Sequence, residues 1–228
     1  FATINYSAIS TVRTEANATA NLSTDKTWYW RVIAFDLAGN NATSPYFIYI
    51  TDTTNPVVKL DSPSNNSFAG SNARVTFTFT ATDTNLKNCT LFHNYNLSTF
   101  SENQTNLSTV SGTATSFVIN VNESTDNSFV WNVLCYDNAS NNAFNATNFT
   151  VRVDTSSPQG FSLVSPANNT VSTNLSPNFD WEDTVEGNFA NYTIEASNGT
   201  NFATINFTNA AKGVVTNSSS NLSEPLVT

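Results

Sequence analysis

The asparagines that stand two residues before a hydroxyl side chain are the groups whose spacing most clearly predicts chemistry in this chain. Twenty Asn-X-Ser/Thr sequons occur in 228 residues, about twice the roughly ten expected if Asn, Ser and Thr were placed at random. A sequon is an acceptor for N-linked sugar on a secreted protein. The alternative is that these residue types are merely abundant and carry no sugar. The predicted acceptors are Asn5, Asn17, Asn21, Asn41, Asn65, Asn88, Asn96, Asn103, Asn106, Asn122, Asn138, Asn145, Asn148, Asn168, Asn174, Asn191, Asn198, Asn206, Asn217 and Asn221.

In ten of these sequons the middle residue is Leu, Phe, Tyr or Cys, as in Asn88-Cys89-Thr90 and Asn148-Phe149-Thr150. On a β-strand, residues i and i+2 share one face and residue i+1 points to the other. We therefore expect such sequons to lie on strands, with the middle side chain buried and the asparagine exposed.

Residues for acid–base catalysis are scarce. His93 is the only histidine and stands beside Asn94 near an expected strand end, so we predict that it lies on the surface. The carboxylates Glu123/Asp126 and Glu182/Asp183/Glu186 could form pairs, but a glycosidase needs two carboxyl groups about 5–9 Å apart in a groove. No groove is expected in a small β-sandwich, so we predict no enzymatic activity unless a cleft forms around Glu182.

Calcium is the most credible metal. Asp52 and Asp154 each come just before a predicted domain junction, and Asp36, Asp83 and Asp137 fall in expected end loops. Calcium needs six or more oxygen ligands, which several loops at a junction could supply. Because no dense Asp-X-Asp loop is present, Asp52 and Asp154 are only weak calcium candidates, and the alternative is that these aspartates cap turns.

The composition limits the partners and the compartment. Only 11% of the residues are charged and the net charge is −9, so nucleic acid would be repelled. The longest apolar runs, such as 46–50, are far too short to span a bilayer, and we expect no membrane insertion by this segment. The sequons place the chain outside the cell, where Cys89 and Cys135 would be oxidised.

Two overlapping repeats reveal the domain organisation. Trp30-Arg-Val-Ile-Ala-Phe-Asp36 matches Trp131-Asn-Val-Leu-Cys-Tyr-Asp137 at an offset of 101 residues, whereas Phe1-Ala-Thr-Ile-Asn5 recurs at 202–206. Two alternating domain types of about 100 residues explain both offsets. We therefore expect the second half of one type at 1–53, a complete domain of the other type at 54–155, and the first half of the first type at 156–228.

Short runs of alternating apolar residues predict strands throughout, and no stretch shows the period of a helix. About seven strands per 100 residues indicates an all-β fold of tandem sandwiches. The segments 27–40, 176–181 and 192–194 resemble strands of fibronectin type III and bacterial immunoglobulin-like repeats. This resemblance implies stalk-like modules of prokaryotic cell-surface proteins, and dense sequons beside a disulfide favour an archaeal envelope.

The strand count also positions the two cysteines. Cys89 falls on the third strand and Cys135 on the sixth, which neighbour each other in one sheet, so we predict a disulfide between them. In the other domain type the equivalent residues are Tyr192 and Ala34, so both cysteines are replaced together. Two reduced thiols remain the alternative.

The leading functional hypothesis is a structural segment of an N-glycosylated extracellular filament or stalk whose partner is itself. Either the polypeptide continues covalently, or the half-domain 156–228 of one subunit is completed by strands from 1–53 of the next. The overlap favours covalent continuation, because residues 1–27 and 202–228 would compete for the same position. The alternative function is an adhesive module for a glycan or protein, with the apolar strand Tyr46–Ile50 as its surface. We expect the tryptophans to pack in the cores and not to bind sugar; they are Trp28, Trp30, Trp131 and Trp181.

Overall fold

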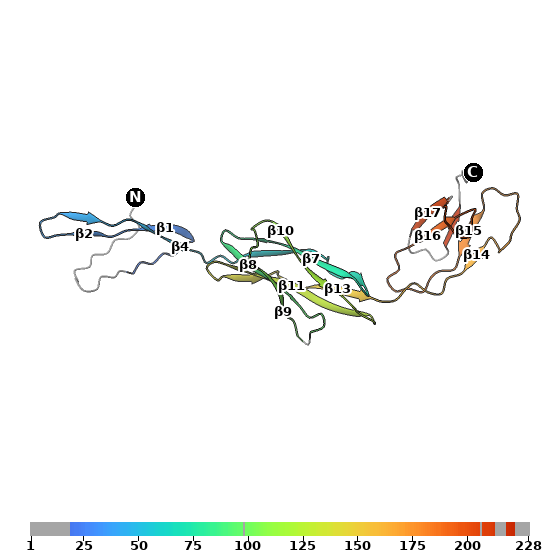
Figure 1. Cartoon of the computed structure of the whole chain (residues 1–228), viewed down its shortest axis with the longest axis horizontal. Coiled ribbons are helices and arrows are strands. Elements are labelled where there is room, and N and C mark those ends of the chain that lie inside the picture. The colour runs from blue at the N-terminus through green and yellow to red at the C-terminus, as the bar shows by residue number, and fades with distance from the viewer. Residues whose placement is uncertain (1–18, 98, 206, 213–217, 222–228) are drawn as a thin grey trace. The chain divides into compact units, whose positions relative to one another are not determined.

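The computed structural model describes residues 19–97, 99–205, 207–212 and 218–221, and these residues form an all-β structure without a helix (Figure 1). The chain divides into two compact units, Phe1–Thr155 and Ser156–Thr228. The all-β class predicted from apolar alternation is confirmed for the described residues.

The first unit begins with a long antiparallel hairpin, here called the amino-terminal hairpin (residues 26–51). Its strands are β1 (Lys26–Trp30), β2 (Ile33–Phe35), β3 (Asn41–Thr43) and β4 (Phe47–Thr51). β1 pairs with β4 and β2 pairs with β3, so that Trp30 lies opposite Phe47. The carboxylate of Asp36 closes the connecting turn by accepting hydrogen bonds from the backbone N–H groups of Ala38 and Asn40, at 2.9 and 2.8 Å.

An intact module (residues 57–154) follows in the same unit. Its strands are β5 (Val57–Ser62), β6 (Ser67–Gly70), β7 (Arg74–Thr82), β8 (Leu86–His93), β9 (Ser101–Asn106), β10 (Ala114–Asn120), β11 (Asn127–Asp137), β12 (Asn142–Phe144) and β13 (Phe149–Asp154). One sheet has the order β10-β7-β5, and the other has the order β6-β13-β11-β8-β9 with β12 also paired to β11. A single core cluster draws its residues from both sheets, which therefore pack face to face.

Alternating residues of the two sheets supply this core. Phe77 and Phe79 on β7 are fully buried, as is Trp131 on β11. The rings of Phe77 and Trp131 meet edge to face with centroids 4.8 Å apart. Full burial of each large apolar side chain stabilises the fold by about 1.5–3 kcal/mol, so these three residues are a major part of the module's stability.

The second unit contains β14 (Leu163–Ser165), β15 (Asn178–Trp181), β16 (Asn191–Ala196), β17 (Phe207–Lys212) and β18 (Ser218–Asn221). The order β14-β15-β18 forms one sheet, and β16 pairs with β17 in another. Trp181 is buried and its ring lies 5.4 Å from that of Tyr192, centroid to centroid. The Oη of Tyr192 accepts a hydrogen bond from the backbone N–H of Thr184 at 2.6 Å, which ties β16 to the loop after β15.

Two expectations about burial are wrong at particular residues. Trp30 is predicted to lie in a core, but its side chain is 52% exposed because the amino-terminal hairpin has no second sheet among the described residues. Leu97, Leu107 and Leu175 are the middle residues of sequons and are also exposed. They lie outside the strands, where the alternation of inward and outward side chains does not apply.

Candidate functional site

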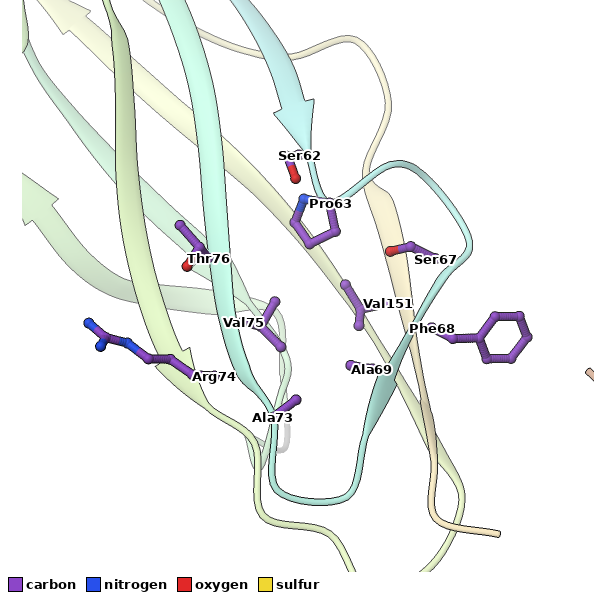
Figure 2. Close-up of a pocket in the computed structure, with 10 residues that line it drawn as sticks. All are labelled: Ser62, Pro63, Ser67, Phe68, Ala69, Ala73, Arg74, Val75, Thr76 and Val151. Atoms are coloured by element: carbon purple, nitrogen blue, oxygen red, sulfur yellow. The ribbon is translucent and has the colours of Figure 1, made fainter. Parts of the chain in front are cut away.

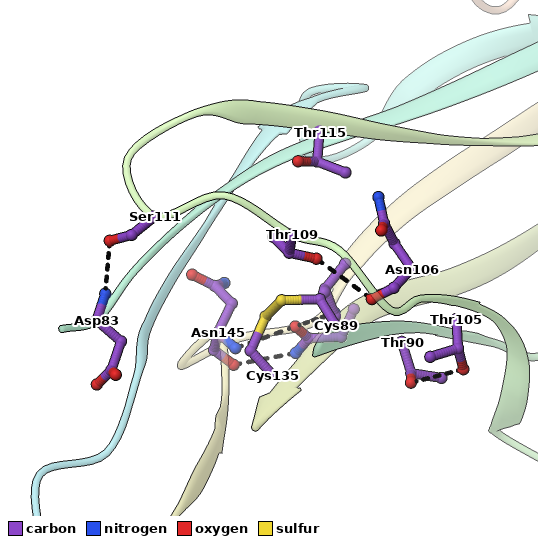
Figure 3. The surroundings of a disulfide bond; sticks show 12 residues. Asp83, Cys89, Thr90, Thr105, Asn106, Thr109, Ser111, Thr115, Cys135 and Asn145 are labelled. Atoms are coloured by element: carbon purple, nitrogen blue, oxygen red, sulfur yellow. Dashed lines mark hydrogen bonds between the residues drawn. A yellow bond between two sulfur atoms is a disulfide. The ribbon is translucent and has the colours of Figure 1, made fainter. Parts of the chain in front are cut away.

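The two cysteines form a disulfide that joins β8 to β11 within one sheet, as the strand count predicts (Figure 3). Cys89 lies directly opposite Cys135 in the antiparallel register, and their Cα atoms are 4.1 Å apart. Both residues are fully buried. The bond joins residues 46 positions apart and so restrains the chain between them.

Hydrogen bonds of hydroxyl and amide groups connect the strands and loops around this disulfide. The hydroxyl groups of Thr90 and Thr105 lie 2.9 Å apart across β8 and β9, and the Oγ of Ser111 accepts a hydrogen bond from the backbone N–H of Asp83 (Figure 3). Asn106 Oδ1 accepts a further bond from the N–H of Ser108 at 2.8 Å. Uncharged polar groups thus stabilise this end of the module.

Most of the sequon asparagines whose side chains the structure describes are exposed to solvent. Of fifteen described side chains, twelve are exposed, three are half-buried and none is buried. The half-buried ones are Asn88, Asn106 and Asn145. Asn5, Asn17, Asn206 and Asn217 lie outside the described residues, and the side chain of Asn221 is also outside them. The twelve exposed acceptors are therefore accessible to modification, whereas the Oδ1 atom of Asn88 is buried.

Three carboxylates converge where the amino-terminal hairpin joins the intact module. Asp52 follows β4, Asp83 follows β7 and Asp137 ends β11. One oxygen from each lies within 4.8 Å of the other two. Asp137 is fully buried, whereas Asp52 and Asp83 are half-buried.

Two asparagine side chains connect these carboxylates. Asn85 Nδ2 donates a hydrogen bond of 2.7 Å to Asp52 Oδ2, and the backbone N–H of Asn85 donates one of 2.6 Å to Asp83 Oδ1. Asn141 Nδ2 donates to Asp137 Oδ2 and also to the backbone carbonyl of Asp52, at 2.7 and 3.0 Å. These amide hydrogen bonds stabilise part of the negative charge of the three carboxylates. The carboxylate oxygens are also ligands of the kind that a hard cation prefers.

The sequence predicts Asp52 as a calcium candidate and places Asp83 and Asp137 in end loops, but it does not single out these two as the partners of Asp52. Among the described residues, Asp154 does not belong to a comparable group of three acidic side chains. Asp83 and Asp137 lie 31 and 85 residues from Asp52 in sequence, so only the closure of the sheets brings them together.

His93 is buried and not on the surface, so this prediction is wrong. Its ring is 3% exposed, and Nδ1 accepts a hydrogen bond from the backbone N–H of Tyr95 at 3.1 Å. Burial lowers the pKa of the imidazole, and an interaction with the side chain of Asn103 opposes that shift in part. Nε2 makes no hydrogen bond of good geometry. An inward-facing imidazole of this kind belongs to the core and is not presented to a substrate.

Three of the candidate catalytic carboxylates make hydrogen bonds within local structure. Asp126 Oδ1 accepts hydrogen bonds from the backbone N–H and the hydroxyl of Thr155, at 2.9 and 2.8 Å. Glu123 Oε1 accepts one from Asn127 Nδ2 at 3.3 Å. Glu186 Oε1 accepts one from the N–H of Asn188 at 3.4 Å. These contacts fix loops and strand ends.

A shallow groove of about 340 Å³ opens between the ends of β5, β6 and β7 (Figure 2). Ala69, Val75 and Val151 line its interior, while Phe68 and Arg74 extend away from it. The lining contains no carboxylate and no histidine, so these residues offer no acid–base pair.

The strand predicted as an adhesive surface is exposed on both faces. From Tyr46 to Ile50 every side chain is between 55 and 65% exposed. Trp30 packs edge to face against Phe47, and Tyr29 packs in the same way against Tyr46. This apolar surface belongs to the amino-terminal hairpin.

Comparison with known proteins gives no relative: no family model matches the chain, and no curated protein matches it. The described residues also contain no helix with the length and hydropathy needed to cross a membrane.

Proposed function

We propose that this chain is a structural repeat segment of a heavily N-glycosylated extracellular filament or cell-surface stalk. Its modules would be immunoglobulin-like or fibronectin type III-like sandwiches, without a catalytic role and without nucleic acid as a partner. The observation that supports this proposal most is the exposure of twelve of the fifteen described sequon asparagines on a disulfide-linked β structure.

The connection between the amino-terminal hairpin and the intact module also suits a stalk. Asp52 lies in the connection, and hydrogen bonds from Asn85 and Asn141 attach both its carboxylate and its carbonyl to the module. Pro56 is fully buried beside it and has a restricted backbone. A linker held by several contacts transmits force and limits bending better than a free tether.

The proposal also includes a calcium ion, bound by Asp52, Asp83 and Asp137. Asp154, the other calcium candidate from the sequence, is not part of this cluster. A cation there would join the carboxylates that follow or end β4, β7 and β11 and strengthen the same connection. The chain's own amide donors satisfy part of this charge already, so the filament role does not depend on the ion.

Glycopeptide mass spectrometry of the protein from its native source tests the central proposal. We expect sugar on several exposed sequon asparagines, for example Asn138 and Asn168, and none on Asn72, which is exposed but lacks a sequon. Bare asparagines at all the described sequons would refute a glycosylated stalk.

The adhesive alternative is favoured by one observation, the two-sided exposure of β4. An adhesive surface would bind a foreign glycan or protein through these aromatic and aliphatic side chains. The same exposure is expected if the hairpin is one part of a sandwich whose other part comes from elsewhere.

A further inference from the structure

The amino-terminal hairpin reproduces three strands of the intact module, with the same register. Trp30 pairs with Phe47 as Trp131 pairs with Phe149, and Ala34 pairs with Ala42 as Cys135 pairs with Ala143. β1 and β2 therefore correspond to β11, β3 to β12 and β4 to β13.

Polar contacts at both ends of the hairpin recur in the module too. Asp25 Oδ1 accepts hydrogen bonds from the N–H and hydroxyl of Thr53, at the same two distances as Asp126 accepts them from Thr155. Asp36 binds Asn40 through backbone and side chain as Asp137 binds Asn141. The amino-terminal hairpin thus has the same local structure as β11, β12 and β13 of the intact module.

The second unit supplies the complementary strands; we call residues 159–221 the carboxy-terminal half. Leu163 pairs with Trp181, and after a register shift Ser165 pairs with Asp180. In the intact module Leu60 pairs with Phe79, and after a shift Ser62 pairs with Thr78. In the same way β15–β18 corresponds to β7–β10, and β16–β17 corresponds to β8–β9.

Each part lacks the neighbour that the other contains. In the intact module β11 lies between β13 and β8, and β8 lies between β11 and β9. Among the described strands, β1 and β2 have partners only in β4 and β3, and β16 has a partner only in β17. An open strand edge is a template for pairing with another chain.

Burial follows the same division. Trp30 is 52% exposed whereas its counterpart Trp131 is fully buried, and Leu163 is 84% exposed whereas its counterpart Leu60 is 4% exposed. Joining the two parts would give each apolar side chain the environment that it has in the intact module.

We propose that the edge of β1 and β2 in one copy of this chain pairs, antiparallel, with the edge of β16 in a second copy. The register of β8 and β11 is transferred by subtracting 101 from the β11 numbers and adding 103 to the β8 numbers. It places Ala34 opposite Tyr192, and Arg31 opposite Glu195. A small residue then faces a large one where the module has its disulfide, and opposite charges face each other on the outer side of the sheet. Because the two edges differ, each copy can bind one neighbour at either end, which gives an open filament when the rotation between neighbours does not close a ring.

The duplicated sequence does not prevent this pairing. Residues 1–5 repeat residues 202–206, but β17 and β18 already lie beside β16 and β15 in the carboxy-terminal half. The second copy needs to contribute only its amino-terminal hairpin. This inference rests on the proposed filament function and specifies its partner.

Disulfide trapping tests the register. A mixture of ¹⁴N- and ¹⁵N-labelled A34C/Y192C chains is oxidised, and cross-linked peptides are identified by mass spectrometry. We expect a mixed-isotope link between positions 34 and 192, because the equivalent residues Cys89 and Cys135 have Cα atoms 4.1 Å apart. The matched control is A34C/T193C, in which the second cysteine points to the other face and the yield falls at least about tenfold.

A charge exchange gives an independent measurement if the cysteine variant fails to fold. E195K places like charges opposite each other and weakens association in sedimentation by about two- to fivefold, and R31E/E195K restores it. The inference is overturned by a link found only within single chains, by equal yields from both cysteine pairs, or by the absence of charge-exchange rescue. Glycosylated asparagines with a failed trap would remove this inference alone, whereas bare asparagines would remove the proposed function.

Discussion

Removal of the Cys89–Cys135 disulfide should destabilise the intact module by an amount that follows from the length of the loop it closes. The two cysteines are 46 residues apart, and closing such a loop lowers the entropy of the unfolded chain by the equivalent of about 4 kcal/mol at 25 °C. Small domains have a total stability of about 5–15 kcal/mol, so the C89A/C135A variant should lose a large part of it. The expected decrease in Tm is about 20 °C.

A second variant separates the covalent restraint from packing. C89Y/C135A carries the residues found at the equivalent positions 192 and 34, and it keeps the sequon at Asn88 because the tripeptide becomes Asn-Tyr-Thr. We expect this variant to restore the side-chain packing that C89A/C135A lacks, but not the entropic contribution of the closed loop. Its stability should therefore remain about 4 kcal/mol below that of the oxidised protein.

Hydrogen exchange of the β7 and β11 amides, measured in increasing urea on the full chain, reports the stability of this module alone. Backbone amides in these central strands exchange only when the module opens. If C89Y/C135A were as stable as the oxidised protein, or if C89A/C135A lost less than about 1 kcal/mol, the loop-closure reasoning would be wrong.

Two further predictions concern groups that the structure places in unexpected roles. Burial lowers the pKa of His93, so the folded state favours the neutral imidazole. The His93 contribution to stability should therefore be constant above the unfolded pKa of about 6.5 and decrease as the pH falls below it. The H93Q variant should lack this pH dependence in thermal unfolding measured between pH 8 and pH 5. Hydrogen bonds to the carboxylates lower the pKa values of Asp25, Asp36 and Asp61. The stability that these groups contribute is lost only as the pH falls through their unfolded value of 3.8 and below it. Acid unfolding near and below that pH should therefore persist in H93Q. D126A should speed exchange of the Thr155 amide by about three- to tenfold, because its acceptor is lost, and an unchanged rate would show that the Asp126 contact contributes nothing to this strand end.

Local pattern predicts the intact module well. Val75, Phe77, Phe79 and Ala81 alternate with polar residues, and all four are buried. Such alternation is a property of single strands and does not depend on how the sheets are arranged. The disulfide between Cys89 and Cys135 could be predicted because counting the strands places these residues on neighbouring strands of one sheet. The repeat offsets carry the same information to the second unit.

The failed predictions depend on contacts between distant segments. His93 stands next to polar residues in sequence, but it ends β8 beside Trp131 of the neighbouring strand β11, and its side chain is buried. Asp52, Asp83 and Asp137 converge because three separate strands end at one edge of the module. Trp30 has the alternation of a core residue, and only the absence of an opposing sheet among the described residues leaves it exposed.

The sparse charge of the surface connects glycosylation with assembly. With 11% charged residues, the polypeptide has few of the groups that normally keep β edges from pairing unspecifically. Sugar on exposed asparagines would cover most of that surface, yet the open edges of β1, β2 and β16 require access for a specific neighbour. Asn191, at the start of β16, is the acceptor nearest to the proposed contact, and in the transferred register it faces Phe35. A glycan at Asn191 must therefore point away from the paired edge, and a chain trapped through positions 34 and 192 should still carry it. Loss of trapping in chains glycosylated at Asn191, together with its recovery in N191Q chains, would mean that sugar closes this edge and that assembly uses another surface.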